Sequence, residues 1–161
     1  MRMPPLWPGL FMALGLSYLT AGIGGALTDL GPWYQALKQP EWKPADLWFG
    51  PIWTTIFTLA AISVWLAWHE AKWPAQQRRV VALFVVNAVC NVGWSALFFA
   101  LKRPDWAMWE WGVLWLSVAS LLVGLWPISK TSALLNAPYL TWVTIAGALN
   151  WANIELNGPF V

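Results

Sequence analysis

Five long apolar stretches constrain this chain more than any other feature of its sequence. They lie near residues 6–27, 49–69, 80–101, 106–126 and 133–154. Each is about 20 residues long, which is the length that a helix needs to cross the hydrocarbon core of a membrane. Inside that core every backbone N–H and C=O must be bonded internally, and the stretches lack the strict alternation of barrel strands. We therefore predict an all-α membrane protein with a bundle of five transmembrane helices.

The composition supports a membrane protein and argues against several other classes. Only 10% of the residues are charged and 59% are hydrophobic, whereas about a quarter of the residues of soluble domains are charged. The net charge of +2 is too small to indicate a nucleic-acid partner. The sequence contains no phosphate-binding loop, no Cys/His cluster for a metal and no catalytic-triad pattern. Because no repeat or linker divides the chain, residues 1–161 are predicted to form a single domain.

The one long polar connection, residues 28–48, is predicted to be a lid. Pro40 and Pro44 prevent a long helix within it. Connections longer than about 12 residues are usually functional lids or disordered segments, and the flat aromatic side chains of this one argue against disorder. The predicted lid residues are Trp33, Tyr34, Lys38, Trp42 and Trp48.

Aromatic and amide side chains are predicted to gather in the half of the bundle beneath this lid. The second and fourth helices start, and the third and fifth end, on the side of the membrane where the lid lies. A rise of about 1.5 Å per residue then estimates the depth of each side chain. The residues below the lid by this estimate are Trp53, Asn91, Trp94, Trp142 and Asn150, with Trp106 at the rim. Because unbonded amides are costly in hydrocarbon, these side chains are expected to face inward.

Two interpretations of this inward-facing set stay open. The amides could bond one another across helices, and the indoles could be ordinary packing residues. Alternatively, small residues such as Ala146 and Gly147 could leave room between the large rings for a guest molecule. A largely apolar cavity with a few amide donors and indole walls suits a flat aromatic ligand.

The first stretch carries a ladder of small residues spaced four apart. Its members are Gly9, Ala13, Ser17, Ala21 and Gly25. Such a stripe lets two helices approach closely in lipid. The sequence leaves open whether the ladder packs inside the bundle or against a second copy of the chain.

Four short segments carry a family pattern. They read WYQALKQPEWKP (33–44), GPIW (50–53), NVGWS (91–95) and PYLTW (138–142). In this order and at these spacings they resemble the TspO/MBR family, whose members include tryptophan-rich sensory proteins and the translocator proteins or peripheral benzodiazepine receptors. The resemblance covers about residues 9–157.

This resemblance implies a five-helix bundle, commonly a homodimer, with a ligand pocket under the lid. It implies a porphyrin or haem-like tetrapyrrole as the ligand, with no required cofactor. By position, the pocket residues of the family correspond to Trp53, Asn91, Trp94, Trp106, Trp142, Ala146 and Leu149, and the depth estimate adds Asn150.

The chain also departs from the family pattern at three places. The lid lacks the second proline of the usual motif and reads Pro44-Ala45-Asp46-Leu47-Trp48. Ala96 stands where the third helix usually has a proline that would kink it. The sterol-associated Tyr and Arg of the last helix are missing between Asn150 and Asn157, which makes sterol binding doubtful.

The expected function is therefore the binding of a tetrapyrrole-like ligand for sensing, regulation or transport, in a multi-pass protein of a bacterial membrane. One alternative is an enzyme, because some bacterial members are described as degrading protoporphyrin photochemically with tryptophans that correspond to Trp53 and Trp142. A binding protein is preferred over an enzyme. The other alternative is a subunit that docks on other membrane proteins in pigment assembly through Trp109, Trp111 and Trp115. Basic residues are divided almost equally between the two sides, so the orientation is not predicted.

Overall fold

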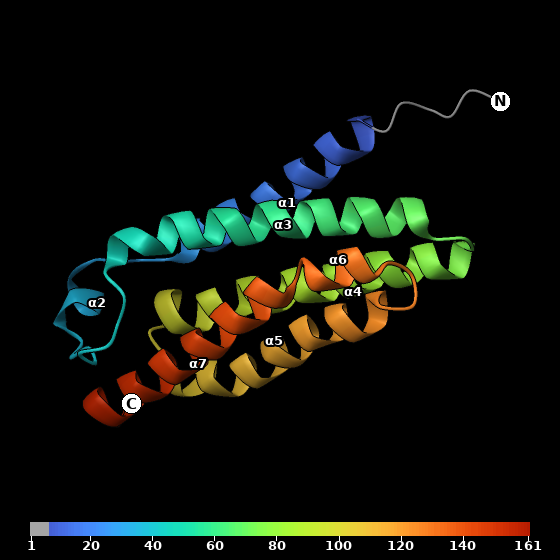
Figure 1. The fold of residues 1–161 in the computed structure, drawn as a ribbon. Coiled ribbons are helices and arrows are strands. Elements are labelled where there is room, and N and C mark those ends of the chain that lie inside the picture. Colours follow the sequence, from blue (N-terminus) through green and yellow to red (C-terminus); the bar gives the residue numbers. More distant parts are fainter. Residues whose placement is uncertain (1–6) are drawn as a thin grey trace.

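The structure, a computed structural model that describes residues 7–161, is a bundle of helices (Figure 1). Its long helices are α1 (Trp7–Leu27), α3 (Phe49–Glu70), α4 (Pro74–Ser95), α5 (Pro104–Leu125) and α7 (Ala137–Asn157). Its short helical segments are α2 (Pro32–Ala36), η1 (Asp46–Trp48), η2 (Ala96–Ala100) and α6 (Lys130–Leu134). The described range contains no strand.

The long helices are suited to a membrane. Helices α1, α3 with η1, α4 with η2, and α5 are each long and apolar enough to cross one. Helix α7 has the same length as α1, 21 residues, but it carries several asparagines and is not among these four spans. The predicted all-α fold and the integral, multi-pass membrane location are confirmed.

Two helices have bounds that differ from the prediction. Helix α4 begins at Pro74 rather than at residue 80, because proline suits a first helical turn and the polar residues after it continue the helix beyond the apolar run. The last predicted helix, 133–154, is divided into α6 and α7, and Pro138 in the first turn of α7 explains the break. Residue 6, where the first helix was predicted to begin, lies outside the described residues.

The small-residue ladder of α1 packs mainly inside the bundle, against α3. Ala13 is buried, and the Ser17 hydroxyl donates to the carbonyl of Phe57 at 2.6 Å. A Cβ at Gly9 would lie 3.5 Å from the Trp65 and His69 rings, so the backbones of α1 and α3 are close at that level. Gly25, in contrast, has open space around it. The ladder therefore serves intramolecular packing over most of its length.

A buried polar network joins α3 to α6 and α7 in the half of the bundle away from the lid. The Ser63 hydroxyl donates to the Ser132 carbonyl at 2.8 Å, and the Ser132 hydroxyl donates to the Ser63 carbonyl at 2.7 Å. The Asn136 amide donates to the Ser63 hydroxyl at 2.8 Å. These bonds fix the start of α7 against α3. They therefore set how far along the bundle axis each α7 side chain lies from the lid.

The α4–α5 and α5–α7 contacts also depend on small or amide side chains. The Asn87 amide donates to the Ser117 hydroxyl at 3.0 Å, so this asparagine bonds across helices. The Trp111 indole N–H donates to the Val143 carbonyl at 2.8 Å, and its ring lies directly over Gly147. Helix α7 is therefore held closely against α5.

Candidate ligand site beneath the lid

Aromatic contacts seat the first half of the lid on the ends of α4 and α5. The Trp33 and Phe98 ring centroids are 6.2 Å apart, and those of Tyr34 and Phe99 are 5.7 Å apart. Tyr34 and Phe98 are buried together with Ala107. The predicted lid residues Trp33 and Tyr34 thus cover the bundle, whereas Trp42 is 55% exposed.

The two phenylalanines under the lid lie in η2, a π-helical turn. The Leu101 N–H donates to the Ala96 carbonyl at 2.9 Å, which is a bond across five residues instead of four. Such widened turns insert an extra residue into a helix and often occur at functional sites. At Ala96, where the related pattern has a proline, the helix is not broken. Its irregular part is the π-helical turn, which begins at this residue.

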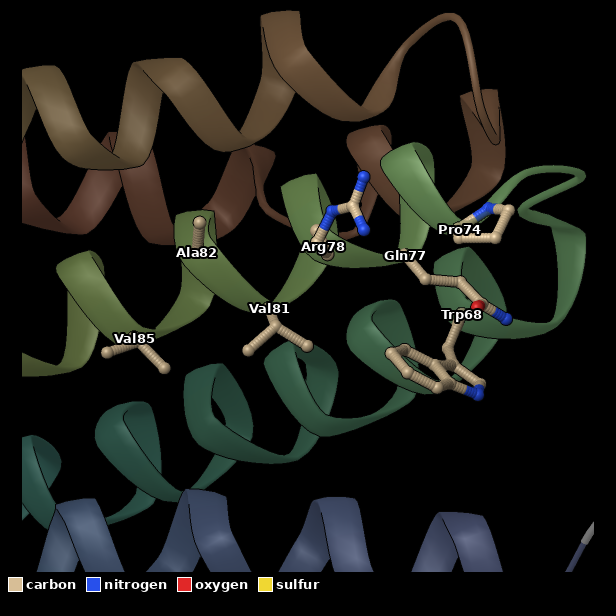
Figure 2. A pocket seen from close by; sticks show the side chains of 7 residues that line it. All are labelled: Trp68, Pro74, Gln77, Arg78, Val81, Ala82 and Val85. Carbon is tan, nitrogen blue, oxygen red and sulfur yellow. The ribbon is translucent and has the colours of Figure 1, made fainter.

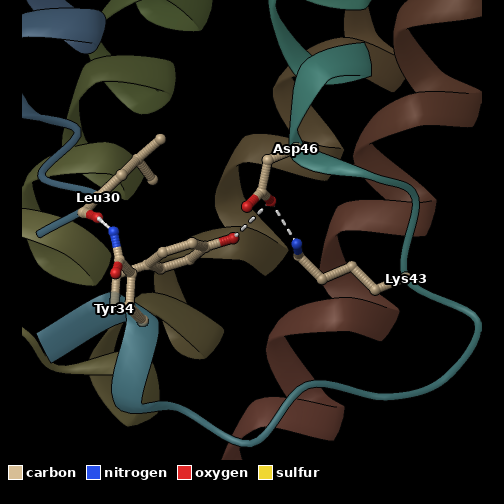
Figure 3. A network of polar contacts seen from close by, with 5 residues as sticks. Leu30, Tyr34, Lys43 and Asp46 are labelled. Carbon is tan, nitrogen blue, oxygen red and sulfur yellow. Dashed lines mark hydrogen bonds and ion pairs between the residues drawn. The ribbon is translucent and has the colours of Figure 1, made fainter. Parts of the chain in front are cut away.

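Asp46 connects the two halves of the lid (Figure 3). The Tyr34 hydroxyl donates to Asp46 Oδ1 at 3.3 Å, and the Lys43 ammonium pairs with the same carboxylate. Burial raises the pKa of the Tyr34 hydroxyl above its ordinary value, so the hydroxyl stays protonated and can donate. Asp46 lies in the segment that departs from the family pattern, so this segment supplies the residue that links the two halves of the lid.

A second contact fastens the lid to the end of α7, and we call it the latch. The Asn157 amide donates to the Lys38 carbonyl at 3.0 Å, and its oxygen accepts from the Lys38 N–H at 2.7 Å. The predicted lid residue Lys38 is thus held through its backbone, not through its ammonium group. The latch depends on one half-buried side chain, so a single substitution can remove it.

We expect Asn157→Ala to loosen the lid without unfolding the bundle. The substitution removes the two hydrogen bonds to Lys38, which together contribute about 1–3 kcal/mol. It also removes the bond from the Asn157 amide to the Asn153 carbonyl, which lies within α7 and does not involve the lid. Amide hydrogen exchange of residues 38–45 should become at least about fivefold faster, while exchange in α4 and α5 stays the same. Glu155→Ala, an exposed change on the same helix end, is the control. Equal lid exchange in Asn157→Ala and the wild type would contradict the latch.

Below the lid, two of the predicted site residues, Trp53 and Asn91, contact Tyr139. The Trp53 and Tyr139 ring centroids are 6.1 Å apart, and the Asn91 amide donates to the Tyr139 hydroxyl at 2.9 Å. Trp94 stacks on Phe98 at 5.2 Å and also packs against the main core. Tyr139 is 2% exposed, so it is the centre of this aromatic cluster. Its 3–4 spacing with Trp142 and Ala146 predicts an inward-facing side chain, but the sequence assigned it no role in the site.

Trp142 lies at the border between this cluster and an apolar groove. It is 7% exposed, and its ring centroid is 5.3 Å from that of Phe49. The groove between α3 and α7 has a volume of about 430 Å³. Its walls are formed by Trp48, Pro51, Ile52, Thr55, Ile56, Pro138, Thr141, Trp142 and Ile145. This volume falls in the range of small-molecule sites, which span about 300–1,000 Å³.

The indole N–H of Trp142 is buried and has no hydrogen-bond partner within residues 7–161. Buried donors in proteins are almost always paired, since an unpaired one costs about 1–3 kcal/mol. The adjacent Trp111 and Trp115 illustrate the rule, because their indole N–H groups donate to Val143 and Thr144 at 2.8 and 2.9 Å. Trp142 is therefore an exception that calls for an acceptor from outside the described protein.

Two other predicted residues are directed elsewhere. With its amide oxygen and nitrogen exchanged, which satisfies both atoms, Asn150 donates to the Pro104 carbonyl at 3.1 Å and accepts from the Met108 N–H at 3.2 Å, so it faces the start of α5. Trp106 is 51% exposed and lies under the Arg103 guanidinium at 4.3 Å. The structure does not bring Trp106 into the cluster around Tyr139. Ala146 and Leu149 follow Trp142 by one and two turns on α7, half-buried and buried.

Glu110 is a half-buried carboxylate near the same end of the bundle. A Cβ at Gly93 on α4 would lie 3.6 Å from its Oε1, and its Oε2 has no partner in the described part of the chain. Arg103 does not pair with Glu110 but donates to Asp105 at 2.8 Å. No group of three His, Cys, Asp or Glu side chains within residues 7–161 could hold a metal ion.

Comparison with known proteins gives matches over almost the whole chain. The TspO/MBR family model matches residues 9–155. Protein CrtK of Rhodobacter capsulatus is 34% identical over 148 residues, which are 92% of this chain and 92% of that protein. Tryptophan-rich protein TspO of Chlorobaculum tepidum is 31% identical over 92% of this chain and 95% of its own length. Translocator protein of Sus scrofa is 28% identical over 92% of this chain and 89% of its own length.

Proposed function

Because the chain belongs to the TspO/MBR family, we propose that it binds a flat, largely apolar ligand of the porphyrin class beneath its lid, in a sensory or translocator role. The role is suggested by the names of relatives, among them a tryptophan-rich sensory protein of Cereibacter sphaeroides that is 30% identical over 90% of this chain. The class of ligand is suggested by the aromatic walls of the site and by the resemblance of its motifs to those of the family.

The observation that carries this proposal is the unpaired indole N–H of Trp142 beside an apolar groove. This nitrogen is closed off in the structure, so a ligand acceptor, such as a porphyrin carboxylate or a carbonyl, would reach it and satisfy the donor once the groove between α3 and α7 widens. The bond would form in a site of low dielectric constant, where hydrogen bonds are strengthened. The apolar body of the same ligand would occupy the groove.

Aromatic side chains would hold the face of the ligand. Trp48 forms one wall of the groove. The Phe49 ring packs against the ring of Trp142, which forms another wall. Offset or edge-to-face contacts between aromatic rings contribute about 0.5–1.5 kcal/mol beyond the burial of their area. Since Trp48 belongs to η1 at the end of the lid, a movement of the lid would change the width of the groove. Ligand entry would then be coupled to the latch at Asn157.

Titration of protoporphyrin IX against tryptophan fluorescence tests this function. We expect saturable quenching with one site per chain. Asn91→Ala should weaken binding about three- to tenfold, because the Asn91 amide fixes the Tyr139 hydroxyl and thereby the ring next to Trp53. Trp109→Phe is the control, since Trp109 is 85% exposed and its loss removes one fluorophore outside the site. Quenching that does not saturate, or equal affinity in wild type and Asn91→Ala, would contradict the proposed site.

A further inference from the structure

A second groove lies at the opposite end of the bundle from the lid, where α3 and α4 diverge from their connecting turn (Figure 2). Its volume is about 440 Å³. Its lining residues are Trp68, Pro74, Gln77, Arg78, Val81, Ala82 and Val85. None of these residues belongs to the site beneath the lid.

The surface that faces the groove is almost wholly apolar, and polar residue types border it only near the α3–α4 turn. Gln77 and the Trp68 indole lie at the end nearest the α3–α4 turn, whereas Val81 and Val85 follow one another along α4 away from it (Figure 2). Seven residues separate Arg78 from Val85, which corresponds to about 10 Å along the helix axis. A phospholipid is likewise polar at one end and apolar at the other, with a phosphate at the membrane surface and a hydrocarbon chain that runs inward.

Exposed tryptophans place the polar end of the groove at the surface of the membrane. Trp68, Trp73 and Trp126 are 43%, 65% and 47% exposed at this end of the bundle. Tryptophan prefers the boundary between headgroups and hydrocarbon, where its ring is buried in lipid and its N–H is hydrated. The groove thus opens sideways into the bilayer at the level of the headgroups, where lipid is the molecule that surrounds it.

The charge around the polar end favours an anionic headgroup. Lys72, Arg78 and Arg79 lie in and after the turn, and Glu70 is the acidic residue that precedes it. No ion pair within residues 7–161 involves Arg78. A guanidinium next to an apolar groove is a suitable partner for a phosphate, because its planar fork of N–H donors matches the phosphate oxygens. Basic pockets between transmembrane helices bind anionic lipids for this reason.

We propose that this groove is a binding site for one anionic phospholipid. The Arg78 guanidinium contacts the phosphate, the Gln77 amide and the Trp68 indole border the glycerol region, and one acyl chain lies along Val81, Ala82 and Val85. The bound lipid lies along α4 and contacts α3 through Trp68 at this end of the bundle.

Native mass spectrometry of the full chain in mild detergent tests the site. We expect the wild type to retain one phosphatidylglycerol molecule, and to retain phosphatidylcholine at least about fivefold less. Arg78→Gln should lower the retained phosphatidylglycerol about fivefold. Arg79→Gln is the matched control, because it removes the same charge from the neighbouring position, which does not line the groove. It should change retention less than twofold.

A variant that fills the groove separates the acyl chain from the headgroup. Ala82→Phe keeps every charge but occupies the apolar part, so it should also lower the retained lipid about fivefold. Glycerol phosphate, which has no acyl chain, should not compete with the lipid at equal concentration. Equal losses in Arg78→Gln and Arg79→Gln, or equal retention of both lipids by the wild type, would overturn the proposal. Unchanged retention in Ala82→Phe would overturn it as well.

Discussion

Gly147→Ala is expected to lower the thermal unfolding midpoint sharply, although it adds only one methyl group. The new Cβ would overlap the Trp111 ring at Cε2, Cζ2 and Nε1. The ring cannot turn aside freely, because its N–H donates to the Val143 carbonyl at 2.8 Å. Relief therefore requires either the loss of this bond or the separation of α5 from α7. Overpacking of this kind costs about 1–3 kcal/mol, and we expect the upper end of that range.

The cause of this effect can be isolated with a double-mutant cycle. Trp111→Leu removes the ring, so Gly147→Ala should cost less than about 0.5 kcal/mol in that background. Gly22→Ala is the control for the added methyl group, because nothing lies within 4 Å of the Cβ it would create. Unfolding can be followed through the reactivity of Cys90, the one cysteine of the chain. If Gly147→Ala and Gly22→Ala unfold at the same temperature, the close α5–α7 contact is not as described.

The apolar pattern predicted which segments are helical better than where they end. Hydrophobicity reports which residues face lipid, so it identifies the α3 segment almost completely, from Phe49 onward. It does not report a helix that continues into water, and the first turns of α4, from Pro74 to Arg79, were missed for that reason. It also does not reveal the interruption before Ala137, where Pro138 and the Asn136–Ser63 bond set the start of α7.

A count along the helices does not predict which way the candidate site residues face. A count of residues along a helix estimates how far a side chain lies from the surface, whereas helix rotation and tilt decide what it contacts. Trp106 is exposed and lies under the Arg103 guanidinium, outside the cluster around Tyr139. The same count placed Trp142 below the lid but did not indicate that its ring contacts Phe49, the first residue of α3. Contacts such as the latch at Asn157 join residues 119 positions apart and could not be derived from local pattern.

Trp142→Phe is expected to weaken ligand binding strongly while it leaves the stability of the protein almost unchanged. The substitution removes a buried N–H that lacks a partner in the described protein and keeps most of the aromatic ring. Loss of an unpaired donor stabilises by about 1–3 kcal/mol, and the smaller ring destabilises by a similar amount. The free energy of unfolding should therefore change by less than about 1 kcal/mol. A bond from this N–H to a ligand carboxylate contributes about 1.5–3 kcal/mol, so the Kd for protoporphyrin IX should rise about 10- to 100-fold.

Trp115→Phe is the matched comparison, and it should give the reverse pattern. The Trp115 indole N–H donates to the Thr144 hydroxyl at 2.9 Å, away from the groove. Its removal leaves affinity unchanged and destabilises the protein by about 1 kcal/mol. Both variants are measured by fluorescence titration and by thermal unfolding in the same detergent. Equal affinity in Trp142→Phe and the wild type would mean that the indole N–H does not contact the ligand. Parallel losses of stability and affinity in Trp142→Phe would make Trp142 a packing residue, and the groove beside it would then have no polar anchor for a porphyrin.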